Sequence, residues 1–219
     1  MVIRENFENN LLNIKGKITE MGKLSIAALE KAFDALKTQD VELALKVIDE
    51  DTGIDDLEMD INQLVIWLMA KEQPVARDLR VIIGVLKISS EIERIADFAV
   101  NIAKATIKIG KTNSLLPLTH LEQMKDVSIQ MLQKALQSFM EENIVLAKEV
   151  SGLEDEVDKY HGETYKKLTA YLSDHPEETN QLVQLLFVNR YLERTADHIT
   201  NIAESSAYLI KGKMYDFNL

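Results

Sequence analysis

Apolar residues recur every three or four positions through most of the chain, the spacing of one buried face on an α-helix. Stretches with this spacing predict six helices, at about residues 3–37, 41–71, 75–111, 119–140, 143–173 and 176–212. Pro74 marks the end of the second helix, and Pro176 stands at the favoured first position of the sixth. The pattern therefore predicts an all-α protein made of long helices.

The helices fall into two similar halves. The stretch Glu-Arg-Ile-Ala-Asp-Phe-Ala-Val-Asn-Ile-Ala at residues 93–103 returns at residues 193–203 with seven of its eleven residues unchanged. Short turns join the three helices of each half, and short turns make consecutive helices antiparallel. We expect two tandem antiparallel three-helix bundles, residues 1–112 and 113–219, related as an internal pseudo-repeat. The Gly- and Pro-containing stretch 110–117 would link them.

Polar residues predict where three of the helices begin. Asp40 and Asn143 precede apolar helical stretches, and their side chains are good N-caps. Thr119, with Glu122 three residues later, has the pattern of a capping box.

Two acidic pairs are expected to face each other across the first hairpin. Glu93 and Asp97 are one helical turn apart in the repeated motif, and Asp51 and Asp55 have the same spacing on the preceding helix. Carboxylates at this spacing repel by roughly 0.2–0.5 kcal/mol in an isolated helix. A hairpin centred on Pro74 places Asp51 opposite Asp97 and Asp55 opposite Glu93, because the members of each pair are equally distant from the turn. The four carboxylates should therefore form one cluster.

The second half repeats this arrangement. Glu154 and Asp158 lie on its middle helix, and Glu193 and Asp197 lie in the second copy of the motif. A hairpin centred on residues 175–176 places Glu154 opposite Asp197 and Asp158 opposite Glu193. The sequence thus predicts two equivalent clusters.

Four clustered carboxylates need compensation by bound cations, by arginine or lysine, or by raised pKa values. Oxygen ligands suit Mg²⁺, Ca²⁺, Mn²⁺ or iron, and carboxylates that bridge ions build multinuclear sites in helical bundles. Asn101 and Asn201, one turn beyond the acids, would add amide oxygens. The predicted metal ligands are Asp51, Asp55, Glu93, Asp97, Asn101, Glu154, Asp158, Glu193, Asp197 and Asn201. His161 offers a nitrogen ligand in the second half alone, although a surface or supporting role is the more ordinary one for this histidine and for His198.

Two other interpretations stay open at this point. Arg94 and Arg194 precede the motif aspartates by three residues, so ion pairs on a solvated face would leave a metal-free helical adaptor. A ferritin-like di-iron carboxylate protein is the second alternative. That fold needs Glu-x-x-His on two of four helices, and here only Asp158-x-x-His161 comes close.

Composition limits the classes of partner. The formal net charge of −11 argues against nonspecific nucleic-acid binding and against an anionic membrane surface. The chain has no cysteine, which excludes disulfides and thiolate metal sites. The densest apolar run, residues 64–70, is too short to span a bilayer, and the first residues lack the apolar core of a signal peptide. We expect a cytoplasmic protein.

The doubled motif, the Gln-Pro-Val-Ala-Arg-Asp-Leu-Arg turn at residues 73–80 and the repeated three-helix unit together resemble the PhoU family of phosphate-specific transport system accessory proteins. The resemblance covers essentially the whole chain. It implies a cytoplasmic, non-enzymatic negative regulator that connects a high-affinity phosphate ABC transporter with a phosphate-sensing histidine kinase, commonly as a homodimer. It also implies metal clusters of iron, manganese, magnesium or zinc at the eight paired acids. Phe98, where the family often has histidine, distinguishes the first copy of the motif from the second.

Overall fold

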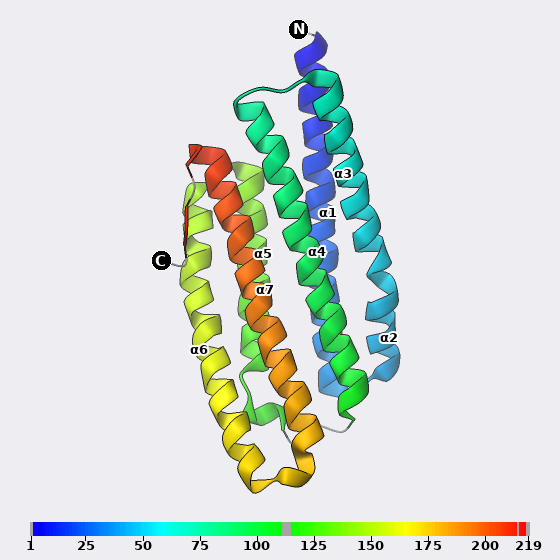
Figure 1. Cartoon of the computed structure of the whole chain (residues 1–219), viewed down its shortest axis with the longest axis vertical. Coiled ribbons are helices and arrows are strands. Elements are labelled where there is room, and N and C mark those ends of the chain that lie inside the picture. The colour runs from blue at the N-terminus through cyan, green and yellow to red at the C-terminus, as the bar shows by residue number, and fades with distance from the viewer. Residues whose placement is uncertain (1, 111–114, 214, 218–219) are drawn as a thin grey trace.

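The computed structural model describes residues 2–110, 115–213 and 215–217, and helices dominate these residues with no strand among them (Figure 1). The α-helices are α1 (Val2–Thr38), α2 (Val41–Glu50), α3 (Thr52–Glu72), α4 (Arg77–Ile109), α5 (Leu121–Glu141), α6 (Ile144–Asp174) and α7 (Thr179–Lys211). Short 3₁₀ turns, η1 (Leu116–Leu118) and η2 (Pro176–Glu178), precede α5 and α7. The all-α prediction is confirmed.

The helix expected at residues 41–71 is divided at Asp51 into α2 and α3, which follow one another along the same side of the first bundle (Figure 1). Asp51, Thr52 and Gly53 are all weak helix formers. The Thr52 hydroxyl donates to the Asp49 carbonyl at 3.0 Å, a local bond that competes with the helical ladder. The long second helix was therefore an oversimplification, although its direction is unchanged.

Two of the predicted helix starts are confirmed. Asp40 Oδ1 accepts a hydrogen bond from the Leu43 N–H at 2.9 Å, and Asn143 Oδ1 accepts from the Val145 N–H at 3.0 Å. Each cap satisfies a donor that the first helical turn cannot pair internally.

The predicted capping box at the start of α5 is wrong. The N-cap position belongs to His120, and the Thr119 hydroxyl instead donates to the Leu116 carbonyl at 2.7 Å. Glu122 turns away to pair with Lys37 of α1 at 2.6 Å. A 3₁₀ turn and a tertiary ion pair have replaced the local motif.

The halves form two antiparallel three-helix bundles, with α1 to α4 in the first and α5 to α7 in the second (Figure 1). The most extensive helix contact in the structure joins α4 to α7, the two motif helices, which run antiparallel. Gly84 permits this approach, since a Cβ there would lie 2.6 Å from a Leu209 methyl carbon. One buried apolar cluster runs through both bundles.

The predicted boundary between residues 112 and 113 lies outside the described residues. In the part of the chain that the structure describes, no helix has the length and apolarity needed to cross a membrane.

Candidate metal centres

The first acidic cluster lies between the α2–α3 junction and α4. The pKa of Asp51 is raised to about 6, first by burial and then by the neighbouring carboxylates of Asp55 and Asp97, whereas Lys104 opposes the shift. Asp51 therefore faces Asp97 across the hairpin, as predicted.

Glu93 completes the first cluster. Burial raises the pKa of Glu93 to about 7, with Asp97 as the strongest neighbouring carboxylate. Arg94 acts in the opposite direction, and Glu58 and Asp55 add to the increase. Asp55 thus lies close enough to act on the Glu93 carboxyl, as the predicted hairpin register requires. Glu58 was missed by the sequence analysis, although its position three residues after Asp55 places it on the same helical face.

The second cluster lies between α6 and α7, and Glu154 is its most buried member, with 7% of its surface exposed. Burial raises the pKa of Glu154 to about 7. The nearby Thr200 hydroxyl lowers this pKa, whereas Asp197, Asp158 and Glu204 raise it. Glu154 and Asp197 therefore face each other as predicted.

Glu193 and Asp197 also have raised pKa values, for which burial is the largest cause. Asp158 raises the pKa of both, so it lies near these two carboxyls, as the predicted register requires. Arg190 opposes the shift at both carboxylates.

Arginines at the outer edge of each motif compensate part of the charge. Arg94 Nη1 lies 3.1 Å from Asp97 Oδ2, and Arg194 Nε lies 3.9 Å from Asp197 Oδ2. These side chains are exposed, and such surface pairs contribute about 0.2–1 kcal/mol. Ion pairs on a solvated face therefore account for the charge of Asp97 and Asp197. They do not reach the carboxylate of the buried Glu154.

The donor chemistry of both clusters fits a hard or borderline cation, because buried carboxylates with raised pKa values gain most from an added positive charge. In the second cluster, Glu193 Oε2 is buried without a hydrogen-bond partner among the described residues and lies 4.0 Å from Arg190 Nη1, whereas the Thr200 hydroxyl acts on the Glu154 carboxylate. Across the same residues, no three His, Asp or Glu side chains converge to the spacing that one ion requires. Chelation would therefore require the carboxylates to rotate toward the ion.

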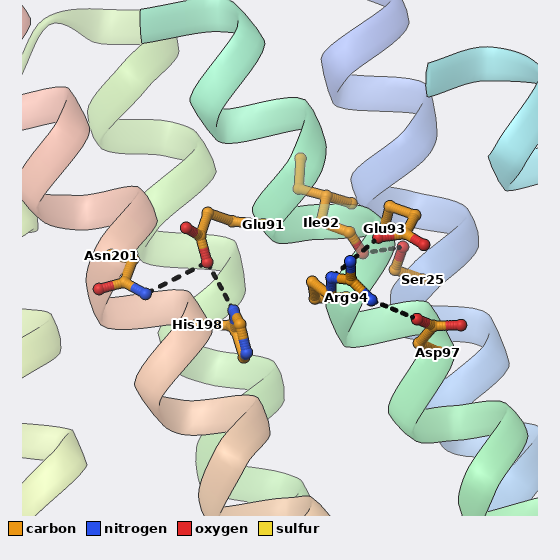
Figure 2. A network of polar contacts seen from close by, with 8 residues as sticks. All are labelled: Ser25, Glu91, Ile92, Glu93, Arg94, Asp97, His198 and Asn201. Carbon is orange, nitrogen blue, oxygen red and sulfur yellow. Dashed lines mark hydrogen bonds and ion pairs between the residues drawn. The ribbon is translucent and has the colours of Figure 1, made fainter. Parts of the chain in front are cut away.

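Asn201, one of the two motif asparagines, contacts the neighbouring bundle in place of the acidic cluster. Asn201 donates its amide N–H to Glu91 Oε2 of α4 at 3.2 Å, and His198 Nδ1 lies 2.6 Å from the same oxygen. Figure 2 shows that Glu91 points from α4 toward α7, while Glu93 and Asp97 lie on the other side of α4. Asn101 is half-buried on α4. The amide of Asn201 thus serves the contact between the bundles.

Glu91 was not found by the sequence analysis. The repeat places Tyr191 at the corresponding position, so the motif comparison gives no acidic signal there. Its role depends on the register of α4 against α7, which no hairpin determines.

A family model described as the PhoU domain matches residues 18–106 and 121–206, one match in each bundle. The chain is 35% identical over 216 residues to a phosphate-specific transport system accessory protein PhoU homolog of Clostridium acetobutylicum, covering 98% of this chain and 99% of the relative. It is 38% identical over 200 residues to a PhoU homolog of Aquifex aeolicus, covering 91% of this chain and 90% of the relative.

Solved structures show the same architecture. PhoU from Pseudomonas aeruginosa superposes with a TM-score of 0.88 at 29% identity, covering 94% of this chain and 100% of that chain. The phosphate transport system regulatory protein PhoU from Streptococcus pneumoniae gives a TM-score of 0.88 at 29% identity, covering 96% and 99%.

Proposed function

The chain belongs to the PhoU family, and we propose from this that it is an accessory protein of a phosphate-specific transport system that regulates phosphate uptake. The observation that carries the proposal is the pair of PhoU-domain matches, which together span both bundles. The curated relatives extend this likeness over nearly their whole length. Each matched segment contains one acidic cluster.

Within that role, we assign the protein a cytoplasmic, non-enzymatic function as a negative regulator. It would act as a homodimer that connects a phosphate ABC transporter with a phosphate-sensing histidine kinase. The resemblance of the doubled motif to the family supports this finer assignment. The net charge of −11 supports protein partners over nucleic acid.

The acidic clusters would hold divalent or ferric ions through Asp51, Asp55, Glu93 and Asp97 in the first bundle and through their four counterparts in the second. A bound cation would reverse the local sign of charge and create an anion-binding point on an acidic protein. The chain itself contributes oxygen donors on two helices per cluster.

A pull-down from phosphate-replete cells of the source organism tests the regulatory role. The wild type should recover transporter and kinase components, and the Glu93→Gln/Asp97→Asn variant should recover less. Asp155→Asn/Glu156→Gln removes two exposed acids of α6 and is the matched control. If the wild type recovers neither class of partner, the regulatory assignment fails.

Elemental analysis of protein purified without added metal tests the clusters separately. Stoichiometric metal supports them, whereas a metal-free adaptor would return none. Oxygen consumption with ferrous iron would instead favour a ferritin-like activity, although the matched fold has two three-helix bundles in place of one four-helix bundle.

A further inference from the structure

The outward face of α3 exposes large apolar side chains to solvent. Met59, Ile66 and Trp67 are 55%, 65% and 45% exposed. Met59 and Ile66 lie seven residues apart, close to two full helical turns, so they share one side of the helix, and Trp67 is adjacent to Ile66. Met69 and, in the turn after α3, Val75 are exposed as well. Apolar surface gathered in this way on a soluble protein is typical of a protein–protein contact.

These side chains lie apart from the core of the first bundle. α3 packs on α1 and α4 through its opposite side, where Ile61, Val65 and Leu68 are buried. Figure 1 shows α3 at the edge of the molecule, on the side of the first bundle away from the second. The apolar residues of the outward face are therefore additional to those that hold the helix in place.

The second bundle shows that the fold does not need apolar residues on this face. α6 occupies the place of α3 in the repeat, with Asp158 equivalent to Asp55. The same alignment gives small or polar residues in place of the three exposed ones of α3, namely Gly162, Thr169 and Ala170. α6 is nevertheless a continuous helix, Ile144–Asp174. Because the two helices have the same place in the architecture, the apolar face of α3 serves a purpose that α6 lacks.

Acidic residues accompany the apolar ones on α3. Asp56 and Asp60 flank Met59 in the sequence, and both are exposed, although Asp60 pairs with Lys17 of α1 at 2.9 Å. The charged residues of the helix are five acids and one lysine, Asp55, Asp56, Glu58, Asp60, Glu72 and Lys71. The ammonium of that lysine lies 4.4 Å from the centroid of the Trp67 ring. A surface with apolar residues and a surplus of acids complements a basic, amphipathic partner.

We propose that this face, formed by Met59, Ile66 and Trp67 with Asp56 and Asp60 beside them, docks a basic amphipathic helix of a partner protein. Apolar residues of such a helix, three, four and seven positions apart, would pack on the three large side chains. Its lysines or arginines would lie against the aspartates, which speeds association and fixes orientation. The inference goes beyond the regulatory role put forward above, since it names a surface and a partner chemistry, and it requires no metal in either cluster.

Trp67 is the only tryptophan of the chain, so its fluorescence reports directly on this surface. The probe is a synthetic helical peptide of leucine and lysine in amphipathic order, and its counterpart has glutamate in place of every lysine. With the full-length protein, the leucine–lysine peptide should shift the Trp67 emission to shorter wavelength and reach saturation, with or without chelator. The leucine–glutamate peptide should leave the emission unchanged, because like charges repel.

Two pairs of substitutions locate the contact. Met59→Ser/Ile66→Ser leaves Trp67 in place and should weaken binding about tenfold or more, since a few large side chains carry most of the affinity of a contact. Asp56→Asn/Asp60→Asn should weaken binding less and reduce its dependence on salt. Urea unfolding of each variant shows whether it remains folded.

The matched control is Val145→Ser/Tyr165→Ser, which removes two exposed apolar side chains of α6 and should leave binding unchanged. If the serine variant of α3 binds as the wild type does, the peptide occupies another surface and the inference is overturned. A red shift of the Trp67 emission on dilution of the protein alone would overturn it too, because a second copy of the chain would then cover the face. Peptide binding here, with neither transporter nor kinase components recovered from cells, would refute the regulatory role and leave the docking surface standing.

Discussion

Each acidic cluster has four carboxylates in the same register, but the residues at the ends of the two clusters differ in chemistry. Lys104 lies near Asp51 at one end of the first cluster, whereas its counterpart Glu204 lies near Glu154 and raises the pKa of that carboxyl. At the other end, His161 of the second cluster stands at the position of Glu58 in the first. The repeat has thus kept the acids and changed how their charge is compensated.

The contact between the bundles shows the same asymmetry. Phe98 of α4 stacks on Tyr191 of α7, with ring centroids 6.1 Å apart. At the equivalent place, with the helices exchanged, His198 of α7 meets Glu91 of α4 at 2.6 Å. The first contact is aromatic and the second is polar, and the two adjoin, because the Phe98 and His198 ring centroids are 5.5 Å apart.

The largest expected effect is stabilisation by metal, which tests whether both clusters bind. Free Mn²⁺ at a hundred times its Kd should raise the free energy of unfolding by about 2.7 kcal/mol per cluster, or roughly 5 kcal/mol for two. Glu93→Gln/Asp97→Asn and Glu193→Gln/Asp197→Asn should each remove about half of that gain. Urea unfolding with and without chelator measures it. Equal stabilisation of the wild type and both variants would show that the acids are not the binding sites.

A smaller effect concerns the cost of holding Glu154 buried. Its raised pKa means that the folded state binds the proton more tightly, so this stabilising contribution is complete below about pH 4 and is lost as the pH rises through about 7. In chelator, Glu154→Gln should therefore match the wild type below pH 4 and exceed its unfolding free energy by about 1–3 kcal/mol above pH 7.

Exposed Glu156 on the same helix provides the control for that measurement. Glu156→Gln should change the unfolding free energy by less than about 0.5 kcal/mol at any pH, as most surface substitutions do. If Glu154→Gln were no more stable than the wild type at pH 8, the carboxylate would already be compensated by the protein.

Much of this fold follows from local regularities of the sequence. The helical spacing of apolar residues, the turns at Pro74 and at residues 175–176, and the caps at Asp40 and Asn143 all act between near neighbours in the chain. The hairpin register follows from the turns alone, which is why the facing of Glu154 with Asp197 was predictable.

The remaining features depend on contacts between distant segments. The polar side of the α4–α7 contact joins residues 107 positions apart, Glu91 and His198, without a turn to determine their register. Similarly, Glu122 has the pattern of a capping box but finds Lys37 on another helix. Sequence periodicity identifies which face of a helix is buried, but tertiary packing decides which polar partner is available there.

The smallest predicted effect concerns the polar contact between Glu91 and His198. It tests whether this contact can be replaced by a copy of the aromatic Phe98–Tyr191 contact. His198→Phe alone leaves Glu91, with its side chain 25% exposed, one hydrogen-bond partner fewer and should cost about 1–2 kcal/mol. The double variant Glu91→Tyr/His198→Phe reproduces the Phe98–Tyr191 stack and should recover most of that loss. Urea unfolding of both single variants and the double variant gives their coupling energy. If the changes in unfolding free energy of the two single variants simply add in the double variant, the rings introduced at positions 91 and 198 do not stack as Tyr191 and Phe98 do.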